Sequence, residues 1–111
     1  MRERFAKIYV DLKEEVVIKR AATSYSAAGS SDVWSTVSTT YGVHQGIDGE
    51  TQRREAMLEV KSESRLLVLY NEDILERDRV YQEDGDFMYV NYVNEYKGHK
   101  TAYLTRVDKS L

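Results

Sequence analysis

Hydrophobic and polar residues alternate along much of this chain in short runs, and these runs are rich in β-branched and aromatic side chains. Such alternation is typical of half-buried strands. The Asp84-Gly85 pair lies between two of the runs and predicts a type I′ hairpin turn, because both residue types tolerate positive φ. The pattern predicts six strands, over residues 15–20, 33–45, 65–70, 79–83, 86–94 and 100–107. We therefore expect a mainly β fold, a small antiparallel barrel or sandwich.

The segment over residues 21–32 interrupts this pattern. It is rich in Ser, Ala and Gly, which bury little surface and cost much entropy to order. We expect a long flexible loop there. Residues 71–79 form a second, polar connection in which Ile74 and Leu75 are the apolar members, and a single turn at this place would plug one end of the sheet.

Residues 49–60 are dense in helix formers, with Asp48 as the expected N-cap and Glu50 in the first turn, where a negative charge is favourable. The apolar residues of this predicted helix form only a thin stripe: Ala56, Met57 and Val60. A helix with so narrow an apolar face is expected to rest on the barrel without being held firmly. This single helix is therefore predicted to detach or rearrange easily.

The composition predicts one soluble domain over residues 1–111. Hydrophobic residues make up 41% and charged residues 32%, and no apolar run approaches the length of a membrane span. The chain has no cysteine, and its first residues lack the apolar core of a secretion signal, so we expect a protein that matures in the cytoplasm. The net charge of −3 argues against a surface that grips nucleic acid phosphates.

No motif in the sequence predicts catalysis, a metal site or a cofactor. The two histidines, His44 and His99, lie far apart and have no partner at ligand spacing. The acidic residues Glu72, Asp73, Glu76, Asp78, Glu83, Asp84 and Asp86 fall in predicted turns. Carboxylates in turns are usually solvated, so we interpret them as a negative rim rather than as acid-base groups.

The chain contains nine tyrosines and two phenylalanines, an unusual excess of tyrosine. Tyrosine buries a large ring while its hydroxyl stays at a wet edge, which suits half-exposed strands and also subunit interfaces. The residues expected to anchor the core or an interface are Trp34, Tyr41, Leu67, Leu69, Val80, Tyr89, Val93 and Leu104.

Three parts of the chain, in this order, carry a resemblance to a known family. They are Val16–Arg20 with the polar loop and the Trp34–Gln45 run, then Gly49–Ala56, and finally Leu67–Tyr70, Asp73-Ile74, Arg79–Tyr81, Phe87–Val93 and Ala102–Leu104. Over about residues 16–107 this order resembles the head-tail joining family of tailed bacteriophages, also called head-closure, stopper or head-tail adaptor proteins.

The resemblance implies a structural virion protein of the phage neck, made and assembled in the bacterial cytoplasm, with no enzyme activity. It implies a ring, typically of twelve copies, even where the isolated chain is a monomer. The portal or an adaptor ring would lie above it, and a tail-terminator or tail-completion protein below. Viral DNA would pass through the centre without sequence-specific binding, and no membrane is involved.

Residues 46–64 correspond to the family's channel-closing segment. The candidate gating residues are Gly46, Ile47, Asp48, Gly49, Glu50, Arg53, Arg54, Ala56 and Met57. The loop over residues 21–32 would adapt to a neighbouring ring, through Ser24, Tyr25, Ser26, Gly29 and Ser30. Strand edges and tyrosines would make the contacts between subunits.

Two alternatives remain open. One is another neck or tail-completion protein that also forms a ring. The other is a single-stranded nucleic-acid-binding barrel of the OB type, in which Tyr81, Tyr89, Tyr92 and Tyr103 would stack on bases. Such barrels combine aromatic residues with a basic groove, whereas acids flank the aromatic strands of this chain.

Overall fold

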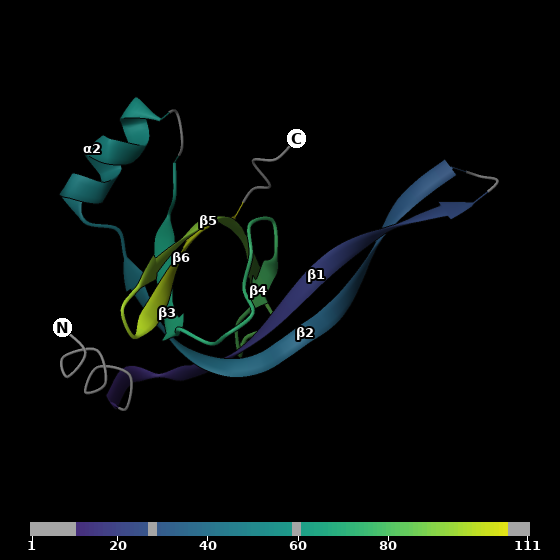
Figure 1. Cartoon of the computed structure of the whole chain (residues 1–111), viewed down its shortest axis with the longest axis horizontal. Coiled ribbons are helices and arrows are strands. Elements are labelled where there is room, and N and C mark those ends of the chain that lie inside the picture. Colours follow the sequence, from purple (N-terminus) through teal and green to yellow (C-terminus); the bar gives the residue numbers. More distant parts are fainter. Residues whose placement is uncertain (1–10, 27–28, 59–60, 107–111) are drawn as a thin grey trace.

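Six antiparallel strands close into a barrel in the order β1-β2-β3-β6-β5-β4 (Figure 1). The computed structural model describes residues 11–26, 29–58 and 61–106. The elements are β1 (Glu14–Ser26), β2 (Gly29–Gly46), α2 (Gly49–Met57), β3 (Ser64–Leu69), β4 (Arg79–Tyr81), β5 (Phe87–Tyr96) and β6 (His99–Thr105). The expected fold class, a mainly β barrel with one inserted helix, is confirmed.

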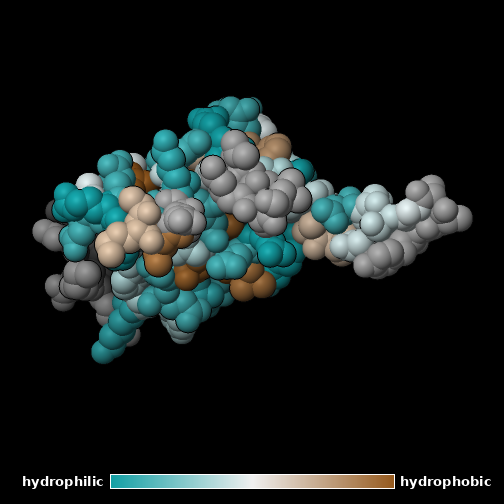
Figure 2. All heavy atoms as spheres, turned by 90° about the horizontal axis from the view of Figure 1, so that it is seen from above, coloured by the Kyte–Doolittle hydropathy of each residue, from teal (hydrophilic) through white to brown (hydrophobic). Residues whose placement is uncertain are grey.

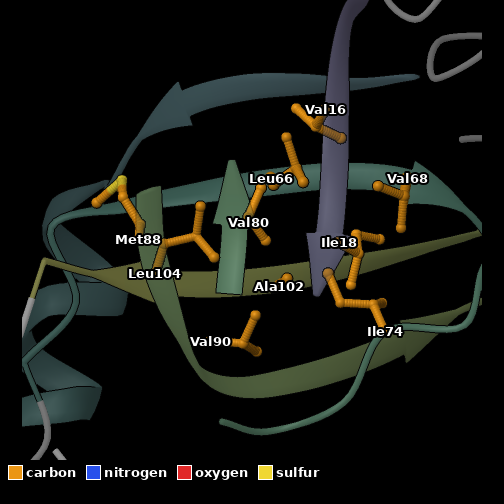
Figure 3. Packing of buried hydrophobic residues seen from close by; sticks show 10 residues of the cluster. All are labelled: Val16, Ile18, Leu66, Val68, Ile74, Val80, Met88, Val90, Ala102 and Leu104. Atoms are coloured by element: carbon orange, nitrogen blue, oxygen red, sulfur yellow. The ribbon is translucent and has the colours of Figure 1, made fainter. Parts of the chain in front are cut away.

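The core fills the inside of this barrel, because alternate residues of each strand point inward. Figure 3 shows the cluster, whose side chains come from five strands and one connection: Val16, Ile18, Leu66, Val68, Ile74, Val80, Met88, Val90, Ala102 and Leu104. Ile74 is 1% exposed and belongs to the connection between β3 and β4. The prediction that this connection plugs the sheet is therefore confirmed for Ile74, whereas Leu75 is 53% exposed.

The prediction of a loop over residues 21–32 is wrong. In the described residues on either side of 27–28, β1 runs to Ser26 and β2 starts at Gly29, with Ala21 opposite Trp34 and Thr23 opposite Asp32. Backbone pairing needs no apolar face, so Ser- and Thr-rich residues form a ladder that composition alone does not predict. Figure 1 shows the resulting two-stranded arm, formed by β1 and β2, projecting from the barrel.

Several boundaries also differ from the sequence prediction. The strand predicted over 79–83 ends at Tyr81, and the turn after it is closed by a hydrogen bond from the Gly85 amide to the Gln82 carbonyl. Of the expected Asp84-Gly85 pair, Gly85 alone has positive φ, so the turn is not type I′. The strands predicted over 65–70 and 86–94 are Ser64–Leu69 and Phe87–Tyr96, and the last strand starts at His99 instead of residue 100. The predicted helix end at residue 60 and the predicted strand end at Val107 lie outside the described residues.

Candidate functional site

Helix α2 is attached to the outside of the barrel by a buried carboxylate, that of Glu55. This side chain is 2% exposed although it belongs to a surface helix. Its Oε1 accepts a hydrogen bond from the Ser62 amide at 3.0 Å, and its Oε2 accepts from the Ser62 hydroxyl at 2.7 Å and from the Tyr92 hydroxyl at 2.6 Å. We call Glu55, Ser62 and Tyr92 the latch, because together they fasten the helix to β5.

The aromatic rings of Tyr92 and Tyr103 support the latch from β5 and β6. They stack with centroids 4.4 Å apart and an interplanar angle of 13°. Burial, and then the hydrogen bond to the Glu55 carboxylate, raise the pKa of Tyr92 above its ordinary value. Its hydroxyl therefore stays protonated and donates to Glu55 through the neutral range. Asn91 adds a bond of 3.1 Å to the Ser62 hydroxyl.

The apolar residues of α2 do not make this attachment. Met57 is 87% exposed, Leu58 beside it is 67% exposed, and Ala56 is exposed as well. The expected apolar stripe resting on the barrel is therefore wrong for Ala56 and Met57, and Val60 lies outside the described residues. Thr51 is the other buried residue of the helix, and Arg65 of β3 lies 3.8 Å from its N-cap Asp48. The hydrogen bonds that join the helix to β5 converge on the Glu55 carboxylate, so its attachment depends strongly on that group.

The N-terminus of α2 is capped as predicted. Asp48 accepts a hydrogen bond from the Thr51 amide at 2.7 Å, and this bond lowers the pKa of the Asp48 carboxyl. Of the other candidate gating residues, Gly46 ends β2 and Ile47 lies in the connection to the helix. The rest are on the helix: Gly49, Glu50, Arg53 and Arg54. The side chains of Glu50, Arg53 and Arg54 are exposed.

A second cluster lies on the outer side of β2, β4 and β5 and surrounds the guanidinium of Arg79. This group lies 3.9 Å from the Trp34 ring centroid and 4.4 Å from that of Phe87. It also donates to the hydroxyls of Tyr81 at 3.3 Å and Tyr89 at 3.1 Å. The rings that the base-stacking alternative requires in this region are therefore in contact with a cation of the chain itself.

Arg20 closes the barrel end near Ile74. It forms two hydrogen bonds of 2.9 Å to Asp78, whose side chain is 1% exposed. It also contacts the exposed Asp73 at 2.9 Å, which lowers the pKa of that carboxyl. Asp78 in turn accepts from the Leu75 amide at 2.9 Å. These bonds fix the connection that carries the core residue Ile74.

A histidine and a serine also meet, at 2.7 Å between His44 Nε2 and Ser64 Oγ. Gln82 donates its amide N–H to His44 Nδ1 at 3.2 Å, so the imidazole proton lies on Nε2 and is donated to Ser64. The Ser64 hydroxyl then donates to the Met88 sulfur at 3.5 Å. A general base needs the opposite tautomer, and we interpret these bonds as a structural chain.

The predicted anchors divide into three groups. Val80 and Leu104 lie in the core, and Val93 packs against it. Trp34, Leu67 and Tyr89 are half-buried, whereas Tyr41 and Leu69 are exposed by 43% and 37%. The core residues of β3 are Leu66 and Val68, one position before Leu67 and Leu69, because the alternation of β3 has the opposite phase to the predicted one.

The candidate interface residues of the former loop lie on the arm. Gly29 and Ser30 are exposed at the start of β2. Ser24, Tyr25 and Ser26 belong to the end of β1, where their backbones pair with β2, and their side chains lie outside the described part of the chain.

Among the described residues, no three His, Asp or Glu side chains are grouped to hold a metal ion, and no helix is long and apolar enough to span a membrane. A pocket of about 380 Å³ lies beside Ile74, Val93 and Lys100. Its lysine is engaged by the Glu72 carbonyl at 2.9 Å and by Glu95 at 3.7 Å.

Sequence reasoning missed Glu55 and Arg79. Glu55 is one of several acids in a helix-forming segment, and its partner Tyr92 lies 37 positions further along the chain. No local pattern connects the two. Arg79 could have been noticed in the sequence, because it is a charged residue at the start of a predicted strand that continues with Val80 and Tyr81.

The chain matches no known protein-family model and no curated protein sequence. A solved structure is similar to this fold with a TM-score of 0.67: the solution structure of protein SF1141 from Shigella flexneri 2a. The match covers 90% of this chain and 96% of that one, at 12% sequence identity. This similarity concerns the fold.

Proposed function

We propose that this chain is a structural virion protein of a tailed phage or prophage that forms a ring at the portal vertex, joins head to tail and helps to close the DNA channel. The segment over residues 46–64 acts as the gate. In this proposal α2 is stored against the outside of the barrel in the free subunit, and it is released when the subunit enters the ring.

The observation that carries this proposal is the latch. Glu55 and Thr51 are the buried residues of α2, and the apolar residues Met57 and Leu58 at the end of the helix are exposed. A segment held by so few groups changes its position at a small cost in free energy, because little apolar area opposes the change. Exposed Met57 and Leu58 are then available to a neighbouring subunit.

The charge distribution also supports a channel protein that does not hold DNA. The net charge is −3, and the turn between β4 and β5 exposes Glu83, Asp84 and Asp86. DNA slides past a negative surface, whereas clustered Lys and Arg retain it through counterion release. Arg53 and Arg54 on α2 are the exception, and as gate residues they would touch DNA when the channel is closed.

The aromatic side chains favour this function over base stacking. Arg79 contacts Trp34 and Tyr89, and Lys19 lies 4.6 Å from the Tyr81 ring centroid. Tyr92 and Tyr103 are stacked on each other. A single-stranded nucleic acid would have to displace these internal contacts before its bases could stack.

The gate is tested in phage particles by replacing Glu50–Leu58 with a Gly-Ser linker of equal length. The barrel core lies outside this segment, so the variant is expected to fold and to assemble particles that lose packaged DNA. Glu76→Gln, at an exposed position outside the gate segment, is the control and is expected to retain DNA. Particles of the linker variant that hold DNA as well as the wild type would overturn the gate, and so would loss of folding.

A further inference from the structure

The arm presents long open strand edges among the described residues. The barrel is closed, so every strand within it has a neighbour on both sides. In the described residues, β1 pairs with β4 only over Val17–Lys19, and β2 pairs with β3 only over Val43–Gly46. Residues 20–26 of β1 pair with residues 29–35 of β2. Along their outer edges, residues 20–26 of β1 and 30–42 of β2 have no partner strand in the described part of the chain.

The open edge of β2 lacks the features that natural proteins use to block strand addition. Residues 29–42 contain no Lys, Arg, Glu or Pro, and Asp32 is their one charged residue. They include the strand-forming residues Val33, Trp34 and Val37. An edge of this length with a single charge and no proline is a template for another strand.

The isolated arm is also expected to have little stability of its own. Its side chains are mostly exposed, and Val33 is 54% exposed. Figure 2 shows the arm extending from the body. Its described residues are mostly pale, which marks intermediate hydropathy, and few of them are brown. A two-stranded ribbon without an apolar face is marginally stable in water, so pairing along its edges would stabilise it.

In a ring of identical copies, the strands that can pair with these edges are those of the neighbouring copies. A rotation about a ring axis leaves the arms of successive copies pointing the same way relative to that axis. The β2 strand of one copy then runs opposite to the β1 strand of the next copy, which is the direction that antiparallel pairing requires. One arm offers both edges, so each copy can serve two neighbours.

We propose that the arm is a strand-pairing interface between copies of this chain, in which the open β2 edge of one copy pairs antiparallel with the open β1 edge of the next. This inference rests on the ring of the proposed function for its choice of occupant. It assigns a contact between subunits to the arm, in addition to the strand edges and tyrosines expected from the sequence.

Two variants test the arm. In the first, residues 22–33 are replaced by Asn-Gly, which joins the paired residues Ala21 and Trp34 by a two-residue hairpin turn. In the second, Val33→Lys and Thr36→Lys add charge to exposed positions of the β2 edge. The matched control carries Tyr70→Lys and Asn71→Lys, which add the same charge at exposed positions on the body.

Self-association of the purified protein is measured by sedimentation up to about 1 mM, since a single contact in a ring can be weak. We expect both arm variants to associate about tenfold or more weakly than the wild type and the control. Circular dichroism separates this effect from unfolding. Hydrogen exchange supplies a second readout: the backbone amides of residues 20–36 should exchange more slowly as wild-type copies associate.

Equal association of all four proteins would overturn the inference, and so would unchanged exchange over residues 20–36 in associated copies. Absence of wild-type association up to about 1 mM would also overturn it. The two proposals fail separately. If the variant without the arm still forms rings on a portal, the connector function stands and the arm interface is wrong. If the protein associates through the arm but does not bind portal rings, the arm interface stands and the connector function is wrong.

Discussion

The hydroxyl of Tyr92 donates a hydrogen bond of 2.6 Å to the carboxylate of Glu55, which joins the last turn of α2 to strand β5. The two residues are 37 positions apart. Because Ser62 also donates twice to the same carboxylate, three donors converge on one charged side chain. Bonds to a charged acceptor are about twice as strong as neutral ones, so removing this charge affects the whole attachment of the helix.

We expect Glu55→Gln to release α2 while the barrel stays folded. An amide nitrogen cannot accept the bonds that Tyr92 and Ser62 donate, so at least one donor loses its partner. The loss of about 1.5 kcal/mol corresponds to roughly tenfold faster trypsin cleavage after Arg53 and Arg54. Glu50→Gln, at an exposed position of the same helix, is the control and should leave the cleavage rate unchanged. Equal rates for both variants would contradict the latch.

Stability should fall at alkaline pH, partly through Tyr92. Its pKa is raised above the ordinary value of 10.0 by burial and by Glu55, so the folded state holds this proton more tightly than the unfolded state does. The associated stability is fully present below pH 10 and is lost as the pH rises from there. Urea unfolding between pH 8 and pH 12 should show a smaller decline for Tyr92→Phe than for the wild type. Tyr103, whose pKa is also raised, accounts for part of the remaining decline.

Asp78 and Asp73 should differ in their contribution to stability although both contact Arg20. Asp78 is buried and also accepts from the Leu75 amide, whereas Asp73 is exposed. Asp78→Asn removes the charge of the buried partner of Arg20 and one of its acceptor oxygens, and we expect a cost of about 2 kcal/mol in the free energy of unfolding. Asp73→Asn is the control and should change the urea midpoint little. The account of Arg20 fails if the two substitutions have equal effects.

Trp34 reports on the Arg79 cluster because it is the one tryptophan of the chain. Arg79→Lys removes the planar group that stacks on Trp34 and bonds to the Tyr81 and Tyr89 hydroxyls. We expect a red shift of Trp34 fluorescence and a loss of about 1 kcal/mol of stability. Arg77→Lys, on an exposed neighbour, is the control. An unchanged emission spectrum of Arg79→Lys would show that the guanidinium does not cover the indole.

The sequence predicted the parts of this fold that rest on local patterns. Alternation located the strands of the barrel, and the Asp48 cap was visible because capping involves residues three positions apart. The arm was missed because its strands are held by backbone pairing between residues such as Ala22 and Val33, which leaves no apolar pattern in the sequence.

The candidate site was harder to predict from the sequence, because its residues also meet only through contacts between distant parts of the chain. Burial of Glu55 depends on the closure of the barrel, which brings Tyr92 and Ser62 to the helix. The phase of β3 was also ambiguous, because Leu66, Leu67, Val68 and Leu69 are all apolar and both alternations fit them. Only packing against the other strands decides which two of these residues enter the core.

The most direct test of the connector function is native mass spectrometry of the purified protein, alone and mixed with portal and adaptor rings of a tailed phage. We predict binding to those rings as a closed ring of identical copies, with no measurable affinity for free single-stranded DNA. A monomer that ignores the rings and binds single-stranded DNA would contradict the connector function and favour the base-stacking barrel.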